Sequence, residues 1–503
     1  MKYGLIAAGE KHTAEAARHI LEAGGNAFDA AVASVFTSMT SEYALTSAGG
    51  GGACLAWKSG ENPVLYDFFV DAPETPENKD VEFFSTVVDF GTTQQIFHIG
   101  KGSIAVPGNI KGLYQIHSEL GSLPISTVLE PAMLTAKNGV PLAKLQSYAF
   151  DLLKPILSHD ESNKNLFYQP DGAFITDGCI FNNPDFANFL DILIDEGPDY
   201  FYSGDGADII LSQHKSGGFL DEQSLLQYQV IKRKPIQSSF AGKTIYSNPM
   251  PSKGGVLIKF LLTLLDKSQS NISPEIIALG MNLTSQVRKE FENGFSTGSL
   301  SQKILDTFSF KLDQRDWDTT ALETGGRGET THVSILDKEG NAVSITTTNG
   351  EGSGYVVPGM GIMLNNMLGE EDLNPDGFHK WKSQCRIPSM IAPTIVAGYG
   401  GPELILGSGG SNRIRSAISQ VIINYCLNNL NLESAVRNPR IHLEGGSLHC
   451  EPGIDLNEPN STIPSTIEIT RWDEQNMFFG GVNAVTKNEA VGDARRGGVG
   501  IIC

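Results

Sequence analysis

Hydrophobic and polar residues alternate along two neighbouring segments of the chain, residues 330–337 and residues 341–348. Alternation of this length is typical of a β-strand with one buried face. Between the two segments, residues 338–340 read KEG, a short turn with glycine where such loops usually need a left-handed residue. The pattern therefore predicts a β-hairpin.

Pairing that is symmetric about Glu339 places Thr330 opposite Thr348 at the open end of this hairpin. A bulge at Gly340 would shift the register by one residue. Facing threonines are ordinary in sheets, because β-branched residues favour strands and often pair across them. On the hairpin alone, a structural role for both threonines is the simpler interpretation.

The segment before the hairpin changes this interpretation. Residues 318–329 read DTTALETGGRGE, a polar, glycine-rich stretch that predicts a flexible approach open to cleavage. If the peptide bond before Thr330 is cut, its new α-amine, with a reference pKa of about 8, can act as the base for its own hydroxyl. One residue would then supply both nucleophile and base.

Helical and extended patterns alternate through the rest of the chain, which predicts two hairpin-rich sheets between layers of helices. Asn26 is a good N-cap for the second helix, and Gly139 ends a later one. Helices are predicted within residues 13–23, 27–36, 106–121, 272–294 and 411–427, and strands at 64–69, 359–365, 391–397 and 403–406.

Composition narrows the classes of function. The chain has 503 residues and a net charge of −20, with no basic run, which argues against nucleic acid or an anionic membrane as partner. The six cysteines are scattered without CxxC spacing, and no ligand-spaced cluster of His, Cys and Asp is present, so no metal and no cofactor are expected. The N-terminal residues lack the regions of a signal peptide, which predicts a cytoplasmic protein.

Several motifs together resemble a known family. TTH at the start of the hairpin is followed by GSGYVVPGMGIMLNN, RIPSMIAPTIV and GSGGSNRI, and the earlier half contains HTAEAARHILEAGGNAFDAAVA, TSAGGGGACLAW and VPGNIKGLYQIHSELG. In this order, the motifs resemble the γ-glutamyltransferases, N-terminal-nucleophile hydrolases that mature by self-cleavage. The resemblance spans nearly the whole chain.

The resemblance implies an α+β fold, the four-layer αββα sandwich of these hydrolases. It also implies cleavage between Glu329 and Thr330, which divides the chain into a large subunit, residues 1–329, and a small subunit, residues 330–503. Both subunits would form one interleaved domain, and a homodimer of that pair is left open.

Catalytic roles follow from the same resemblance. Thr330 matches the nucleophile, and Thr348 matches the threonine that holds the nucleophile's hydroxyl by a hydrogen bond. Gly410 and Ser411 stand where the family has two glycines whose backbone N–H groups bind the oxyanion. Serine at 411 departs from that pattern only mildly, because the donors are main-chain groups.

The pattern weakens in the substrate pocket. Relatives that act on glutathione hold the glutamate α-carboxylate with an arginine and paired serines. Here Phe69 stands at the arginine position, and Ser389 is followed by Met390. Losing this contact removes about 1.5–3 kcal/mol of charge-assisted binding. Arg386 and Arg413 are the cations that would replace it.

The residues that bind the substrate α-amine in the family are only partly retained. Glu370 matches the acidic residue that binds the substrate α-amine, whereas Met367 replaces a glutamine. Asn349, in a loop shorter than the family's, is a further candidate for that amine. His332 resembles a Ser/His-type base, but we interpret it as structural, pointing away from the side of Thr330.

The first hypothesis is a self-cleaving γ-glutamyltransferase or glutathione hydrolase that forms a γ-glutamyl-enzyme and passes the acyl group to water or an amine. The alternative within the same chemistry is an amidase for another acyl group, such as the glutaryl or adipyl groups removed by cephalosporin acylases. A third possibility is a non-catalytic scaffold, which the intact Thr330 and Thr348 argue against.

Overall fold

The computed structural model is an α+β structure with two main β-sheets, and the predicted hairpin lies in the first. The predicted approach segment, residues 318–328, lies outside the described residues. The structure describes residues 2–74, 80–89, 94–214, 216–267, 272–292, 302–317, 329–456 and 461–503. None of the helices in these ranges is both long and apolar enough to cross a bilayer.

The first sheet has seven strands and contains the hairpin near its centre. The chain termini meet at its edge, where the backbone N–H of Tyr3 donates to the carbonyl of Cys503 at 2.8 Å. The strands, in spatial order, are β22 (Val499–Ile502), β1 (Gly4–Ala8), β11 (Thr331–Asp337), β12 (Ala342–Thr348), β2 (Gly51–Trp57), β3 (Val64–Phe68) and β8 (Ile231–Arg233).

The second sheet has six strands and packs against the first, with β16 and β20 facing β11. All of its strand pairs are antiparallel. The strands, in spatial order, are β21 (Ala490–Val491), β20 (Gly481–Thr486), β16 (Gly401–Gly409), β15 (Thr394–Gly398), β10 (Lys243–Ser247) and β9 (Ile236–Phe240).

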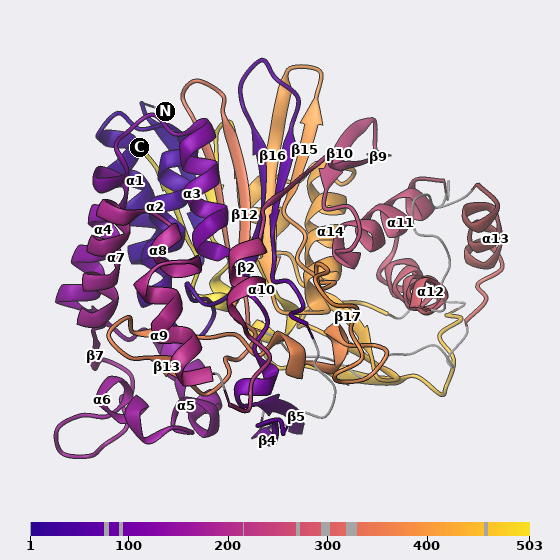
Figure 1. Cartoon of the computed structure of the whole chain (residues 1–503). Helices are drawn as coiled ribbons and strands as arrows, with labels where there is room; N and C mark the ends of the chain where they lie inside the picture. Colours follow the sequence, from indigo (N-terminus) through magenta and orange to yellow (C-terminus); the bar gives the residue numbers. More distant parts are fainter. Residues whose placement is uncertain are drawn as a thin grey trace.

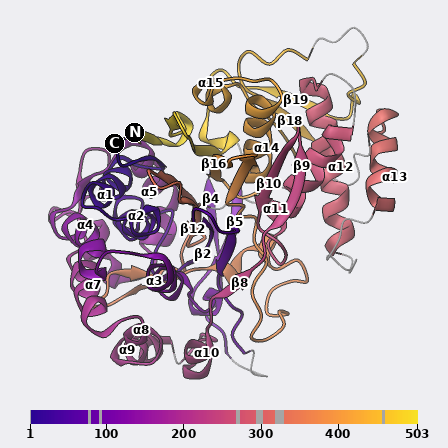
Figure 2. The same ribbon diagram turned by 90° about the horizontal axis from the view of Figure 1, so that it is seen from above.

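Helices lie beyond both sheets. Figure 1 shows one group on the left, next to β12 and β2, and another on the right, next to β16 and β10; the view from above keeps the two groups apart (Figure 2). The first group includes α1 (Lys11–Glu22), α2 (Ala27–Ser41), α3 (Asn109–Leu120), α4 (Ile125–Asn138) and α7 (Pro184–Glu196), and the second α11 (Lys253–Lys267), α12 (Pro274–Glu292), α13 (Gln302–Asp313) and α14 (Arg413–Cys426).

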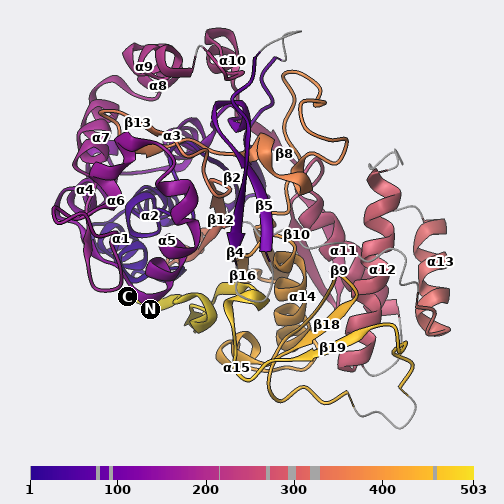
Figure 3. The ribbon, with the colours of Figure 1, turned by 90° about the horizontal axis from the view of Figure 1, so that it is seen from below.

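Smaller elements surround these layers. The three-stranded sheet β17 (Ile441–Glu444), β18 (Ser447–Cys450) and β19 (Glu468–Arg471) lies near α12 and α14 (Figure 3). The others are β4 (Phe84–Asp89), β5 (Gln94–Ile99), β6 (Val140–Pro141), β7 (Ile180–Phe181), β13 (Val356–Val357), β14 (Ile362–Met363), α5 (Lys144–Leu157), α6 (Lys164–Phe167), α8 (Asp199–Tyr202), α9 (Asp205–His214), α10 (Glu222–Gln227) and α15 (Leu432–Arg437).

Helix α2 shows how local sequence positions the hairpin. Asn26 caps it as predicted, in a capping box in which Asn26 accepts from the N–H of Asp29 and Asp29 accepts from the N–H of Asn26. The helix runs five residues beyond the predicted end at Phe36, to Ser41, and every residue in it is buried. It packs on β11 and β12 and against α1 and α4, so it is covered on all sides.

The predicted register of the hairpin is confirmed. Thr331 pairs with Thr347 and Leu336 with Ala342, so the pairing is symmetric about Glu339 and no bulge shifts it. Gly340 has φ 87°, the left-handed conformation that the turn requires.

Glycines on β16 allow the two sheets to approach closely beneath the hairpin. A Cβ on Gly407 would lie 2.3 Å from the imidazole ring of His332, and a Cβ on Gly409 would lie 2.2 Å from the carbonyl oxygen of Thr330. Neither distance is possible for a real side chain. These two glycines therefore place the start of β11 directly on the end of β16.

Gly407→Ala should lower the free energy of unfolding by about 1–3 kcal/mol, because the buried ring of His332 cannot move without disturbing its neighbours. Gly400→Ala is the control, since a Cβ there meets only the end of the Lys487 side chain, at 3.7 Å. Thermal unfolding of both variants checks the prediction. Equal stability of the two would contradict the tight packing described here.

Candidate active site

A small cavity lies at the open end of the hairpin. Six of the eight predicted site residues line it, all except Asn349 and Gly410. The lining comprises Phe69, Thr330, Thr348, Met367, Glu370, Asp372, Leu373, Ser389, Met390, Ile391, Ser411 and Ile414. Residues from distant parts of the chain are thus brought to one place.

Thr348 is hydrogen-bonded to the carbonyl group of the peptide bond that is predicted to be cleaved. Its hydroxyl donates a hydrogen bond of 2.5 Å to the carbonyl oxygen of Glu329, and its oxygen accepts from the N–H of Gly350 at 3.1 Å. The resemblance implied a bond to the hydroxyl of Thr330 instead, but in the uncleaved chain the single hydroxyl proton goes to this carbonyl. A donor in this position stabilises the charge that the carbonyl oxygen gains when a nucleophile attacks.

The turn after β16 lies against Thr330. Gly410 and Ser411 have φ values of 113° and 48°, so both adopt left-handed conformations. Helix α14 begins at Arg413, and its N-terminal dipole favours negative charge near this turn. Gly409 contacts the carbonyl of Thr330 and Ser411 lines the cavity with Thr330, so this turn lies close to the predicted nucleophile, which is only 5% exposed.

One wall of the cavity is apolar where the resemblance implied a cationic clamp. Phe69 is buried, and its carbonyl accepts from the hydroxyl of Tyr228 at 2.6 Å. Ser389 donates to the hydroxyl of Ser252 at 3.1 Å, and Met390 beside it supplies no hydrogen-bond donor from its side chain.

The two replacement cations considered from the sequence do not line the cavity. Arg386 binds Asp67 at 2.8 Å and Asp71 at 2.7 Å. Arg413 pairs with Glu444 at 2.9 Å. Each guanidinium is therefore already held by carboxylates of this chain.

Two acidic residues lie close to the nucleophile: Glu370, which is half-buried and lines the cavity, and Glu351, which is buried near Glu370 and Glu329. Burial, with a smaller contribution from Asp372, raises the pKa of Glu370 to about 8. Burial and then the charges of Glu370 and Glu329 raise the pKa of Glu351 well above its ordinary value. Oε1 of Glu370 has no hydrogen-bond partner among the described residues, whereas the side chain of Asn366 and the backbone N–H of Glu329 lie close enough to the carboxyl of Glu351 to oppose the rise of its pKa. Such a pair of acceptors can hold an ammonium group.

Sequence reasoning did not find Glu351, because a glutamate in a glycine-rich loop is usually solvated. The loop after β12 folds back instead. Gly350 has φ 61°, and a Cβ there would lie 2.2 Å from Oε1 of Glu370. The N–H of Glu351 donates to Oδ1 of Asn366 at 2.9 Å, which fixes the loop.

Asn349 lies outside the cavity lining. It is buried, and its Oδ1 would lie 3.1 Å from a Cβ on Gly50. The amide is thus directed toward the glycine-rich segment before β2, and its suggested contact with a substrate amine stays a prediction.

The prediction that His332 points away from Thr330 was wrong, because residues two apart on a strand share a face. Its ring contacts Gly407 on the same facing strand that Thr330 contacts. The ring nitrogens lie 2.8 Å from the hydroxyl of Thr346 and 2.9 Å from that of Ser334. Burial lowers the pKa of His332 to about 3, so the ring is neutral.

On the opposite face of β11, Thr331 donates to Glu42, the residue after α2, at 2.6 Å. Thr13 donates to the other oxygen of this carboxyl at 2.7 Å. Burial raises the pKa of Glu42 to about 7, although these two hydrogen bonds act in the other direction. The residue after the predicted nucleophile is therefore anchored to a buried carboxyl.

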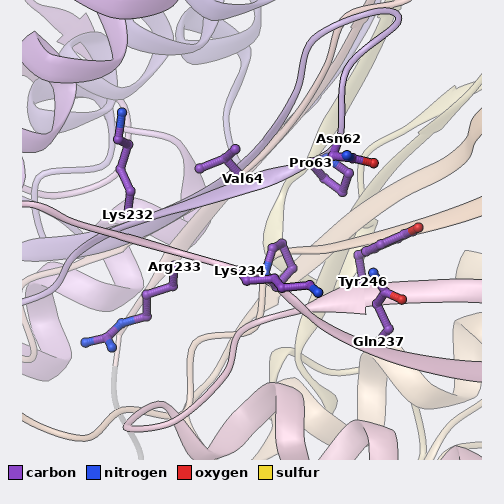
Figure 4. Close-up of a pocket in the computed structure, with 9 residues that line it drawn as sticks. Asn62, Pro63, Val64, Lys232, Arg233, Lys234, Gln237 and Tyr246 are labelled. Atoms are coloured by element: carbon purple, nitrogen blue, oxygen red, sulfur yellow. The ribbon is translucent and has the colours of Figure 1, made fainter.

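A larger groove of about 530 Å³ lies elsewhere, between the edge strands β8 and β9 (Figure 4). Its basic residues include Lys232, paired with Glu119 at 3.0 Å, and Arg233, paired with Asp67 at 2.7 Å. Its lining contains no serine, threonine or cysteine. It therefore lacks the hydroxyl or thiol nucleophile that the predicted chemistry needs, and the smaller cavity, which contains Thr330, is the candidate site.

A buried threonine just before a central strand, with a hydroxyl donor on the carbonyl that precedes it, is the arrangement expected in the precursor of an N-terminal-nucleophile hydrolase. A sequence profile described as Gamma-glutamyltranspeptidase matches residues 13–503. The chain belongs to the γ-glutamyltranspeptidase family.

Individual relatives agree with this assignment. The chain is 30% identical to a glutathione hydrolase proenzyme of Pseudomonas aeruginosa, over 87% of this chain and 82% of that protein. It is 27% identical to an acylase ACY 1 proenzyme of a Pseudomonas species, over 96% and 90%. The fold matches the crystal structure of a cephalosporin acylase from Bacillus halodurans with a TM-score of 0.82 and 22% identity, over 99% of this chain and 96% of that one.

Glu42→Gln should remove the part of the pH dependence of the free energy of unfolding that comes from titration of Glu42. The folded pKa of Glu42 lies above its ordinary value of 4.5. Its stabilising contribution is therefore complete below pH 4.5 and lost as pH rises through about 7, a difference of about 3 kcal/mol. Urea unfolding of both proteins between pH 5 and pH 8.5 checks this prediction. The free energy of unfolding of the variant should increase relative to that of the parent as pH rises. A constant difference across this range would show that Glu42 does not titrate there.

Proposed function

We propose that the protein is a self-processing γ-glutamyltransferase or glutathione hydrolase in which Thr330 is the nucleophile. The observation that supports this most directly is the hydrogen bond from Thr348 to the carbonyl of Glu329, the group that Thr330 must attack to free its own amine. Membership of the γ-glutamyltranspeptidase family supplies the reaction class.

Self-cleavage begins when the hydroxyl oxygen of Thr330 attacks the carbonyl carbon of Glu329. The bond from this carbon to the nitrogen of Thr330 breaks, and the hydroxyl proton ends on that nitrogen, which becomes an amine. An ester then joins Glu329 to the oxygen of Thr330. Water hydrolyses the ester, which restores the hydroxyl and leaves Glu329 with a carboxylate. Thr348 stabilises the charge on the carbonyl oxygen throughout.

Turnover repeats this chemistry on an external amide. The free α-amine of Thr330 takes the proton from its hydroxyl as the oxygen attacks the substrate carbonyl. The backbone N–H groups of Gly410 and Ser411 bind the resulting oxyanion, and the leaving amine takes the proton. Water or an acceptor amine then removes the acyl group from Thr330.

The mature protein would consist of residues 1–329 and residues 330–503, interleaved in the four-layer αββα sandwich of the N-terminal-nucleophile hydrolases. The two facing sheets, with helices beyond each, support this arrangement. β1 and β11 are neighbours in one sheet although they fall in different fragments, so separation would break a strand pair. The scattered cysteines favour a cytoplasmic location.

The amine of a γ-glutamyl donor would bind to Glu370 and Glu351. Glu370 lines the cavity close to the buried Glu351, and its Oε1, which has no partner among the described residues, needs positive charge or a donor. An ammonium group supplies both and would lower the raised pKa of Glu370.

An acylase for a different acyl group is the second candidate. Phe69 and Met390 favour it, because they make one wall apolar where a glutathione-binding site needs polar contacts. The acylase relative, matched over most of this chain, supports the same alternative.

Purified protein should separate into two bands on a denaturing gel, with threonine at the N-terminus of the smaller fragment. Thr330→Ala should leave one full-length band and no activity, since it lacks the hydroxyl. Thr330→Ser should mature more slowly, because serine lacks the methyl group that restricts the side-chain rotamer. Persistence of the intact parent chain after long incubation would contradict the proposal and favour a scaffold role.

Glu370→Gln should raise the KM for γ-glutamyl-p-nitroanilide about tenfold or more and leave the KM for glutaryl-p-nitroanilide within about threefold, because only the first donor carries the amine. Steady-state kinetics of the cleaved protein measures both values. Equal changes for the two donors would place the amine elsewhere.

A further inference from the structure

Arg496 lies beside the oxyanion turn, although it is remote from that turn in sequence. Its Nη1 would be 3.2 Å from a Cβ on Gly409, and its Nη2 would be 3.2 Å from a Cβ on Gly410. The side chain is 12% exposed, and its stem packs over Gly481 of β20. Arg496 does not line the cavity of the uncleaved chain, but its guanidinium is held next to the turn that carries the predicted oxyanion donors.

The guanidinium of Arg496 has one charged partner among the described residues, Glu329, with Nη1 3.3 Å from Oε2. Its Nε has no hydrogen-bond partner in this part of the chain. The adjacent Arg495 differs, because it binds both Glu451 and Asp493. Arg496 is thus paired with the residue that self-cleavage would turn into a chain end.

Glu329 is itself an acyl group of defined length. In the ester formed during self-cleavage, its carbonyl carbon is bound to the oxygen of Thr330, the same linkage as in the acyl-enzyme of turnover. From that carbonyl to the side-chain carboxylate, Glu329 has the carbon skeleton of a glutaryl group. A γ-glutamyl donor has the same skeleton, with its amine at the other end.

The two ends of this skeleton are both held in the structure. The carbonyl oxygen accepts from Thr348 at 2.5 Å, and the carboxylate lies 3.3 Å from Arg496. The side chain of Glu329 is 6% exposed, so solvent contributes little to its pairing. The uncleaved chain therefore occupies the site in the way that a dicarboxylic acyl donor would.

We propose that Arg496 binds the distal carboxylate of the substrate in the mature enzyme, and that Glu329 masks it until self-cleavage. This inference rests on the proposed function and names the substrate class as amides of glutaryl-length dicarboxylic acids, with γ-glutamyl amides among them. Arg496 would then replace the arginine that glutathione-binding relatives have at the position of Phe69. Cleavage turns the carbonyl of Glu329 into a second carboxylate at a buried position, and the free-energy cost of burying this added charge favours its departure.

Arg496→Gln should raise the KM for glutaryl-p-nitroanilide roughly 10–100-fold, because a charge-assisted hydrogen bond is lost. The KM for pentanoyl-p-nitroanilide, which has a methyl group in place of the carboxylate, should change less than about threefold. Arg496→Lys should have a KM for glutaryl-p-nitroanilide between those of the parent and Arg496→Gln, because lysine keeps the charge without the forked geometry of the guanidinium. Lys234→Gln, which removes a positive charge from the groove of Figure 4, is the matched control and should leave both values unchanged.

Rates are normalised to the cleaved fraction seen on gels. Equal KM changes for the two donors in Arg496→Gln would overturn the role of Arg496 and leave the proposed function intact. Absence of turnover of every donor by fully cleaved parent enzyme would instead overturn the proposed function. Glu329→Gln should give mature enzyme with parental KM values, and a changed KM would show that Glu329 stays in the site.

A second measurement does not depend on whether the Arg496 variants mature. Phenylglyoxal, which modifies accessible arginines, should label Arg496 in the mature parent enzyme at least several-fold faster than in uncleaved Thr330→Ala. Glutarate should protect the mature enzyme, and pentanoate should not. Peptide mass spectrometry locates the label. Equal labelling of the two forms, or no protection by glutarate, would overturn the masking of Arg496 by Glu329.

Discussion

The hydrogen bond from Thr348 to the carbonyl of Glu329 depends on one register of one hairpin. A slip of a single residue would turn every side chain of a strand to the opposite face, and Thr348 would then point toward the helices. The alternating side chains, the left-handed glycine in the turn and the pairing with β1 and β2 on either side all oppose such a slip. The chemistry at Thr330 therefore depends on the packing of the whole first sheet.

Close contact between the sheets supplies the other half of the site. Glycines at 407 and 409 let β16 lie directly on the ring of His332 and on the backbone of Thr330, and the turn that follows contains Gly410 and Ser411. The same closeness keeps water out. Burial is the main cause of the raised pKa of Glu370 and of the lowered pKa of His332. A cavity of this kind strengthens each charge interaction within it.

Charge is arranged around Thr330 in two parts. Glu351 and Glu370 supply carboxyl groups near the cavity, and Arg496 supplies a cation next to the oxyanion turn. An amino acid donor has an ammonium group and a carboxylate, which these parts complement. The uncleaved chain satisfies only the cation, through Glu329, so the precursor and a bound substrate are expected to compete for the same group.

The sequence by itself determined the hairpin, its register, the helix that Asn26 caps and the family, because these depend on local periodicity, local capping and ordered motifs. Its motifs also singled out Phe69, Glu370 and Ser389, which line the cavity together with Thr330 and whose roles in binding substrate stay predictions. Glu351, Arg496 and the true face of His332 were missed or wrong. Glu351 is buried only because its loop folds back over Asn366, and Arg496 reaches Glu329 only because the end of the chain returns beside β20. Contacts between residues so far apart in sequence leave no local pattern, so only the tertiary structure decided them.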